Sequence, residues 1–143
     1  MNISTKGRYG LRAIIDLARN YQGKPVTLSA IAKRQQISEG YLEQLMASLK
    51  KAGLVKSTRG AQGGYVLALD AQNISVGEIF RALEGELALT SCLGDDTTKS
   101  CAMQDCCGSR FIWQEIQNSI NTVLDLHTLA DLLTKEENLP EKL

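Results

Sequence analysis

The sequence predicts a mainly α-helical chain, in which a winged helix-turn-helix is followed by a long amphipathic helix. Three patterns support this fold class. Apolar residues recur at helical spacing through the first 53 residues, two short strand-like runs flank the loop at 60–64, and helical spacing returns over 109–133. Between the last two patterns lies a polar stretch that contains all four cysteines.

The first 53 residues predict three helices. The first runs from about Gly7 to Tyr21, and the second is short, with Leu28, Ile31 and Ala32 on one face. The second and third helices are separated by a short turn, which is the arrangement of a helix-turn-helix.

The third helix has the clearest boundaries. Ser38 is a favourable N-cap residue, and Gly53 stands where a glycine commonly ends a helix. Its inward stripe is Tyr41, Leu42, Leu45, Met46 and Leu49. Its outer face carries the polar residues Glu39, Glu43, Gln44 and Lys51.

Two strand-like runs, LVKSTR and YVLALD, follow directly and predict a hairpin. The joining loop GAQGG is too small and flexible to pack a core. A helix-turn-helix followed by a hairpin is a winged helix. This wing carries Lys56, Ser57, Thr58 and Arg59, which suit phosphate oxygens or the electronegative minor groove of DNA.

The net charge of zero conceals two halves of opposite sign. The first 60 residues carry eleven Lys or Arg against three acidic residues, a net charge of +8, and the remainder carries five against thirteen, a net charge of −8. Such a split indicates a polyanion-binding head, although a solvated basic face would produce the same charge pattern. Taken with the basic wing, it makes double-stranded DNA the leading partner.

Two further helices complete the pattern. One begins after Ser75, which forms a capping-box pattern with Glu78. The other is long, over 109–133, and its apolar stripe consists of Trp113, Ile116, Ile120, Val123 and Ala130, widened by Ile112, Leu124 and Leu126. A small monomer could not cover so wide a stripe, so we expect a homodimer that binds a palindromic operator with half-sites about 34 Å apart.

These elements divide the chain into a winged-helix DNA-binding domain (1–75), a connecting helix with a cysteine loop (76–108) and a dimerisation helix with a tail (109–143). No apolar run approaches the roughly 18 residues of a membrane span, and no signal-peptide pattern is present, so we expect a cytoplasmic protein without a membrane partner. A single histidine, no catalytic constellation and no phosphate loop argue against an enzyme with a small-molecule substrate.

The cysteines have the spacing Cys92-x8-Cys101-x4-Cys106-Cys107. So polar a stretch buries little apolar area, and something other than packing must order it. Cytosolic thiols are kept reduced, which favours metal or redox chemistry over disulfides. A zinc site usually needs two tight knuckles, of which only Cys101 to Cys106 fits, whereas an iron-sulfur cluster tolerates irregular spacing. The spacing favours a cluster over zinc only slightly.

Three segments closely resemble the IscR-type transcription regulators, a family that also contains CymR-like and NsrR-like repressors. They are ISTKGRYGLRAIIDLA at the start, ISEGYLEQLMASLKKAGLVKSTRGAQGGYVLA in the middle and the late cysteine loop, so the match covers essentially the whole chain. The resemblance implies a dimeric winged-helix repressor of genes for iron-sulfur cluster biogenesis or sulfur metabolism. In the IscR and NsrR branches it also implies a 2Fe-2S or related cluster.

The resemblance further implies which residues act. By position, Cys92, Cys101 and Cys107 look like the three cluster-binding cysteines. The residues that would face DNA are Tyr41, Glu43 and Gln44 of the recognition helix and Ser57, Arg59, Gly60 and Gly64 of the wing. In the IscR branch, a Glu at the place of Glu43 is implicated in how the cluster state alters the choice of DNA site.

The fourth ligand departs from the family pattern. Where IscR-type proteins have a His, this chain has Arg110, which stays protonated and cannot ligate iron. The carboxylate that NsrR-like members use corresponds to Arg8. We take Cys106 as the first candidate on thiolate affinity, and the further candidates are Asp95, Asp96 and Asp105.

Two alternatives to a cluster sensor stay open. A cluster-free, CymR-like repressor would be controlled by a partner protein or by cysteine oxidation, and a zinc-stabilised regulator would use the thiols structurally. His127, the only histidine, falls on the apolar side of the long predicted helix, and we interpret it as a dimer-core residue.

Overall fold

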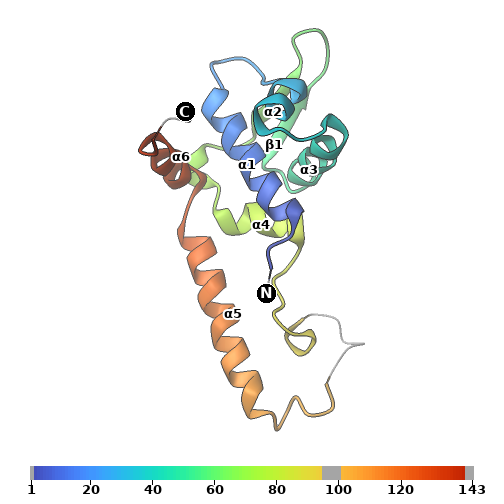
Figure 1. Ribbon diagram of the computed structural model, residues 1–143, viewed down its shortest axis with the longest axis vertical. Helices are drawn as coiled ribbons and strands as arrows, with labels where there is room; N and C mark the ends of the chain where they lie inside the picture. Colours follow the sequence, from blue (N-terminus) through green and yellow to red (C-terminus); the bar gives the residue numbers. More distant parts are fainter. Residues whose placement is uncertain (1, 95–100, 141–143) are drawn as a thin grey trace.

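The computed structural model describes residues 2–94 and 101–140, which form two parts that we call the head and the arm (Figure 1). The head contains α1 (Thr5–Asn20), α2 (Leu28–Gln35), α3 (Glu39–Lys51), β1 (Val55–Thr58), β2 (Gly64–Leu67), the 3₁₀ helix η1 (Ala71–Asn73), α4 (Val76–Glu84) and α6 (Leu129–Glu137). The arm consists of α5 (Gly108–Leu126) and the described residues of the cysteine segment (85–107), which are 85–94, with the 3₁₀ helix η2 (Ser91–Leu93), and 101–107. The predicted fold class, mainly α with a winged helix-turn-helix and a long further helix, is confirmed.

The head encloses one apolar core. Its largest fully buried side chains are Ile14, Leu17, Ile31, Leu42, Met46, Leu49, Val55, Ile74, Ile79 and Leu129. They come from α1, α2, α3, β1, α4 and α6, and Ile74 follows η1. The predicted inward stripe of the third helix is confirmed for Leu42, Leu45, Met46 and Leu49, and Tyr41 packs at the edge of the core.

Side-chain caps fix where the head's helices begin. The Ser38 hydroxyl accepts a hydrogen bond from the Tyr41 amide at 3.2 Å, which confirms Ser38 as the N-cap of α3. After α3, Gly53 has φ +78°, a conformation that favours glycine at the end of a helix. Ser75 and Glu78 form the predicted capping box of α4.

The wing is a two-stranded antiparallel hairpin in which Val55 pairs with Leu67 and Thr58 pairs with Gly64. Its second strand is tied to the loop before α2, because Val26 and Tyr65 exchange backbone hydrogen bonds of 2.9 and 2.8 Å. A Cβ atom at Gly64 would lie 2.4 Å from the Val26 carbonyl oxygen. Gly64 therefore allows two backbones to approach closely where the second strand begins.

The single long helix predicted over 109–133 is wrong, because the chain turns at His127 and Thr128 between α5 and α6. Here the chain pairs with the segment before α4: the Val76 amide donates to the His127 carbonyl and the Leu129 amide donates to the Ile74 carbonyl, both at 2.8 Å. Thr128 then caps α6 in a reciprocal pair with Asp131. The turn lets Leu129 enter the core of the head.

The position of His127 also differs from the prediction. His127 is the exposed C-cap residue of α5 rather than a residue along the apolar side of a continuous helix. The nearby end of α5 is held against α4 by an ion pair between Arg81 and Asp125. A Cβ atom at Gly77 would overlap the Asp125 carboxylate at 1.9 Å, so the two helices meet where a side chain is missing.

Candidate nucleic-acid interface and cysteine segment

The polar face of α3 and the wing lie next to each other in the head. Glu43 and Gln44 are exposed on α3, and Ser57, Arg59 and Gly60 are exposed on the wing. The Lys50 ammonium donates to the Ser57 hydroxyl at 2.6 Å and so bridges the end of α3 and the first strand of the wing. In this way the fold places five of the seven residues predicted to face DNA on exposed positions of two adjoining elements.

The other two predicted residues, Tyr41 and Gly64, have packing roles. Tyr41 is partly buried, and its hydroxyl donates to the Thr5 hydroxyl at 3.3 Å. Its ring meets the Tyr9 ring edge-on at a centroid distance of 6.2 Å, so α3 is fixed against α1 through these side chains. Gly64 is required by the backbone pairing described above.

Two arginines flank the Tyr9 ring beside the start of α3. The guanidinium carbons of Arg8 and Arg12 lie 5.9 and 5.2 Å from the Tyr9 ring centroid. The sequence analysis considered Arg8 at the place of a cluster ligand and counted both arginines in the basic charge of the first 60 residues. Their positions extend this positive charge along α1, next to the helix predicted to read DNA.

Glu43 also affects Tyr65 in the second strand of the wing. Burial and, second, the negative charge of Glu43 raise the pKa of the Tyr65 phenol above its ordinary value. This shift places the negative charge of Glu43 near the wing, so the residue predicted to influence the choice of DNA site lies close to both α3 and the wing.

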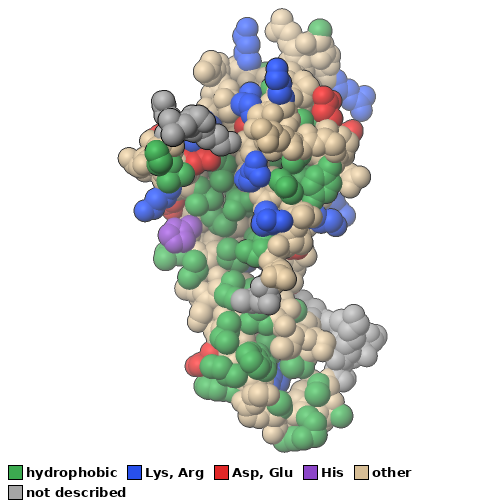
Figure 2. Space-filling view, in the orientation of Figure 1, with side chains coloured by type: hydrophobic (Ala, Val, Ile, Leu, Met, Phe, Trp, Pro, Cys, Tyr) green, Lys and Arg blue, Asp and Glu red, His purple; other side chains and the backbone are tan. Residues whose placement is uncertain are grey.

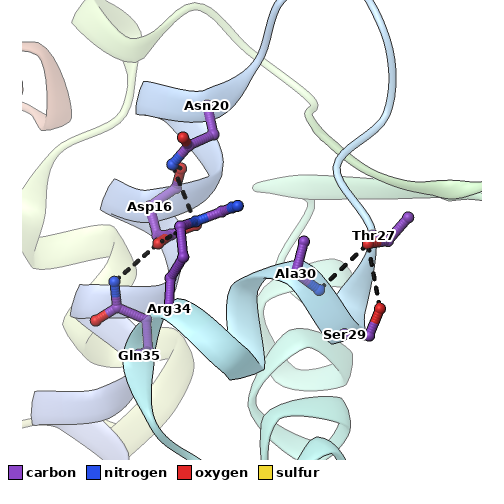
Figure 3. A network of polar contacts seen from close by, with 7 residues as sticks. All are labelled: Asp16, Asn20, Thr27, Ser29, Ala30, Arg34 and Gln35. Atoms are coloured by element: carbon purple, nitrogen blue, oxygen red, sulfur yellow. Dashed lines mark hydrogen bonds and ion pairs between the residues drawn. The ribbon is translucent and has the colours of Figure 1, made fainter.

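The buried side chain of Asp16 joins α1 to α2 (Figure 3). The side chain of Asp16 in α1 is 3% exposed and accepts hydrogen bonds from Arg34 at 2.6 and 3.0 Å and from Gln35 at 2.8 Å. Asn20 donates to the Asp16 carbonyl at 2.8 Å. The hydrogen bond to Asp16 raises the pKa of Arg34, with burial opposing it. Arg34 and Asp16 thus fix α2 against α1, a contact that the sequence analysis does not predict.

The cysteine segment leaves the head after α4, and its residues 101–107 lie at the start of α5, at the end of that helix away from the head (Figure 1). Cys92 is partly buried on η2, and its sulfur lies 3.1 Å from the Thr90 hydroxyl oxygen. The Leu89 amide donates to the side-chain oxygen of Gln117 at 3.1 Å, and Gln117 is the one buried residue of α5. This hydrogen bond tethers the first half of the segment to α5.

The second half of the segment is more open. Cys101 and Cys106 are exposed, Cys107 is partly exposed, and all four cysteines are free thiols. Cys107 is the N-cap residue of α5, with its sulfur 3.1 Å from the Ser109 hydroxyl oxygen. The Ser109 hydroxyl, followed by the Arg110 amide, lowers the pKa of the Cys107 thiol. A larger fraction of Cys107 is therefore thiolate at neutral pH than for an ordinary cysteine.

The predicted ligands do not form a ready-made metal centre. Among residues 2–94 and 101–140, no three Cys, His, Asp or Glu side chains come together in a way that could hold a metal ion. Asp95 and Asp96 lie outside the described residues, and Asp105 is exposed. Among the described residues, the buried Nε atom of Arg110 has no hydrogen-bond partner. The donor types suit an iron-sulfur cluster, but their described arrangement does not.

Comparison with known proteins identifies the family. Residues 3–135 match the Rrf2 family, described as "Iron-dependent Transcriptional regulator". The chain belongs to the Rrf2 family. Among relatives, the HTH-type transcriptional regulator CymR of Bacillus subtilis (strain 168) is 44% identical over 132 residues, which cover 92% of this chain and 89% of CymR. The HTH-type transcriptional regulator IscR of Escherichia coli O1:K1 / APEC is 39% identical over 139 residues, covering 97% and 84%.

A solved structure agrees with this assignment. T. potens IscR is 44% identical, has a TM-score of 0.75, and the match covers 99% of this chain and 94% of that chain. The relatives of this Rrf2-family chain are named as transcriptional regulators and include both IscR and CymR. The chain is accordingly a DNA-binding transcriptional regulator and not an enzyme. In the described part of the chain, no helix is both long and apolar enough to span a bilayer.

Proposed function

We propose that this Rrf2-family chain is a homodimeric repressor that reads a palindromic operator through α3 and the wing. The observation that carries the proposal is the exposed surface formed by Glu43, Gln44, Ser57 and Arg59, joined by the Lys50–Ser57 hydrogen bond. A capped helix that presents polar groups beside a basic hairpin is suited to base edges in the major groove and to phosphates or the minor groove nearby.

The arm supplies the argument for the homodimer. Phe111, Val123 and Leu126 on α5 are 67%, 56% and 73% exposed. Figure 2 shows hydrophobic side chains gathered over the arm, whereas Lys and Arg side chains are spread over the head. An exposed apolar surface of this kind usually marks an interface, and a second copy of α5 would cover it. Two-fold pairing of the arms would present two recognition helices to one operator.

We further propose that the cysteine segment is the input of the regulator, with a 2Fe-2S cluster bound by Cys92, Cys101 and Cys107 and with Cys106 as the first candidate for the fourth ligand. Four thiols in one segment, the lowered pKa of Cys107 and the similarity to IscR support this. Binding would require the two halves of the segment to come together, because they do not do so in the described arrangement. Free thiols also suit the reducing cytoplasm.

A second candidate is a cluster-free, CymR-like repressor that responds through the cysteines themselves or through a partner protein. The separated thiols, the exposed Cys106 and the similarity to CymR favour it. Iron, zinc and acid-labile sulfide in protein purified without oxygen distinguish the two. Iron and sulfide that are lost in Cys92→Ala, Cys101→Ala and Cys107→Ala support the cluster, whereas a colourless, iron-free preparation supports the CymR-like function.

The DNA-reading role is tested on a duplex selected by the protein from a random library. Arg59→Ala is expected to weaken binding and to reduce the slope of log affinity against log salt by about one unit, because one phosphate contact is lost. Glu43→Ala is expected to relax sequence preference more than it lowers affinity. The matched control is Lys135→Ala, which removes an exposed charge from α6. Equal effects of Arg59→Ala and Lys135→Ala would contradict the assignment of the wing.

A further inference from the structure

Glu84, the last residue of α4, lies where the head meets the cysteine segment. Its Oε1 atom accepts hydrogen bonds from the Gly7 amide, at 2.8 Å, and from the Ser4 hydroxyl. Ser4 is the N-cap residue of α1, and the first turn of α1 has no acidic residue of its own. Glu84 therefore supplies, from a position 77 residues away in sequence, the negative charge that stabilises the amino end of a helix.

The crossing of α1 and α4 is shaped to admit this carboxylate. A Cβ atom at Gly7 would lie 2.7 Å from Glu84 Oε1, and one at Gly10 would lie 2.4 Å from Leu83. Both distances are shorter than real Cβ contacts, so the two glycines let the end of α4 sit directly on α1. The Gly7 amide is reachable only because the residue has no side chain.

The same first turn of α1 touches the predicted recognition helix. The Tyr41 hydroxyl donates to the Thr5 hydroxyl, and the Tyr41 and Tyr9 rings pack edge-on. The Tyr41 amide also belongs to the first turn of α3, where it donates to Ser38. A shift of the first turn of α1 is thereby passed to the amino end of α3, the end that lies beside Glu43 and Gln44 in sequence.

On its other side, Glu84 adjoins the cysteine segment without an intervening element. Gly85 ends α4, and the chain then runs to Leu89, whose amide is tethered to Gln117, and on to Cys92. A change in the segment that moves or releases Leu89 is passed to Gly85 through residues 86–88 alone. Glu84 is the residue of the head that directly precedes the segment.

We propose that Glu84 is a positioning residue that couples the state of the cysteine segment to the first turn of the recognition helix. The inference rests on the proposed function, because it needs the cysteines to be an input. When the segment is in its native state, Glu84 holds Ser4 and Gly7, and these hold Thr5 against Tyr41. When the segment changes, the carboxylate withdraws and Tyr41 loses its fixed partner, so DNA affinity changes through a shift between two arrangements.

The test compares DNA affinity in two states of the cysteines. Protein isolated without oxygen is compared with the same protein after all thiols are blocked with iodoacetamide, on the library-selected duplex. The wild-type ratio of affinities is expected in the usual range of allosteric coupling, roughly 5-fold to 150-fold. Glu84→Ala is expected to bring this ratio close to one. Glu84→Gln should retain part of it, because the amide oxygen can still accept from the Gly7 amide.

Two further variants separate coupling from mere stability. Gly7→Ala keeps Glu84 but displaces its carboxylate, and Ala favours a helix more than Gly does. The higher helix propensity of Ala offsets part of the lost hydrogen bond, so this variant should lose coupling at a smaller cost in stability than Glu84→Ala. Glu86→Ala removes an exposed carboxylate two residues further on and should respond like wild type. Hydrogen exchange of residues 38–44 should change between the two cysteine states in wild type and in Glu86→Ala, but not in Glu84→Ala or Gly7→Ala.

The outcomes distinguish this inference from the proposed function. If wild-type affinity does not depend on the cysteine state, the input role of the segment is wrong and the coupling role of Glu84 fails with it. If wild type responds and Glu84→Ala and Gly7→Ala respond equally, the cysteine input stands and only the role of Glu84 is overturned. Loss of the response in Glu86→Ala as well would also overturn it, because the effect would then belong to charge and not to the contact with α1.

Discussion

The head and the arm differ in whether the chain itself covers their apolar side chains. In the head, α1, α2, α3, α4 and α6 all contribute side chains to one closed core, and even the acid Asp16 is fully partnered. In the arm, α5 is 19 residues long and buries one residue, the polar Gln117, while five of its large apolar residues are exposed: Phe111, Ile112, Trp113, Val123 and Leu126. The head is therefore stabilised by its own core, whereas the apolar face of α5 is left for a second surface to cover.

The largest expected effect is in the core of the head. Leu42 is fully buried among the helices of the helix-turn-helix, so Leu42→Ala should lower the free energy of unfolding by about 2–5 kcal/mol. Leu139→Ala, at an exposed position near the end of the described chain, should change it by no more than about 0.5 kcal/mol. Urea unfolding at one fixed protein concentration measures both. Similar changes in the free energy of unfolding for the two variants would contradict the view that the head is stabilised by its own core.

The next effect tests what covers the arm. Val123→Asp places a charge on the exposed apolar face of α5. Loss of a buried valine contact at an interface corresponds to about 1.5–3 kcal/mol, or tenfold or more in the dissociation constant. Sedimentation equilibrium should show weaker self-association than in wild type, with helix content unchanged. The matched control is Asn118→Asp, a charge of the same sign at an exposed polar position of α5. A monomeric wild type would contradict the proposal that a second copy of α5 covers this face.

A smaller effect concerns the tether between the cysteine segment and the arm. Gln117→Leu keeps the volume but removes the acceptor for the Leu89 amide. An unsatisfied buried amide costs about 1–3 kcal/mol, so the segment should detach and this amide should exchange roughly tenfold to hundredfold faster. Gln114→Leu is the control, because Gln114 donates only to Asn118 within the same helix. Unchanged exchange at Leu89 would mean that the tether does not hold the segment.

The smallest effect is in the reactivity of the Cys107 thiol. Because the pKa of Cys107 is lowered, mainly by the Ser109 hydroxyl, a larger fraction of Cys107 is thiolate at neutral pH. Ser109→Ala should raise this pKa and slow the alkylation of Cys107 near pH 7, as measured by mass spectrometry. The rates of wild type and Ser109→Ala should converge as the pH rises above the pKa of Cys107 in both proteins. Equal rates at Cys107 in the two proteins near pH 7 would contradict this.

Much of the head could be predicted because its signals are local. The Ser38 cap, the Ser75–Glu78 capping box and the inward stripe of α3 each depend on residues a few positions apart, and all are present. The break between α5 and α6 was missed because apolar spacing continues across it. The Thr128–Asp131 capping pattern was a usable signal, but the decisive pairing with Ser75 joins distant parts of the chain.

The tertiary contacts of Glu84 and Asp16 were the least predictable from the sequence. Glu84 meets Gly7 and Asp16 meets Arg34 only through the tertiary fold, and neither acid differs in sequence from an ordinary surface charge. The sequence identifies the cysteines as possible ligands, but it carries no information on whether Cys92 meets the others. Whether Cys92 meets the other cysteines is decided by interactions other than packing in the apolar core.

The most direct test of the central claim measures how the head responds to the arm. Fluorescence anisotropy gives the affinity for the library-selected duplex of wild type and of a variant with Cys92, Cys101, Cys106 and Cys107 all changed to Ala, each purified without oxygen. We expect the affinities to differ by about fivefold or more, while both proteins show the same unfolding transition of the head. Identical affinities would contradict the claim that the cysteine segment regulates DNA binding.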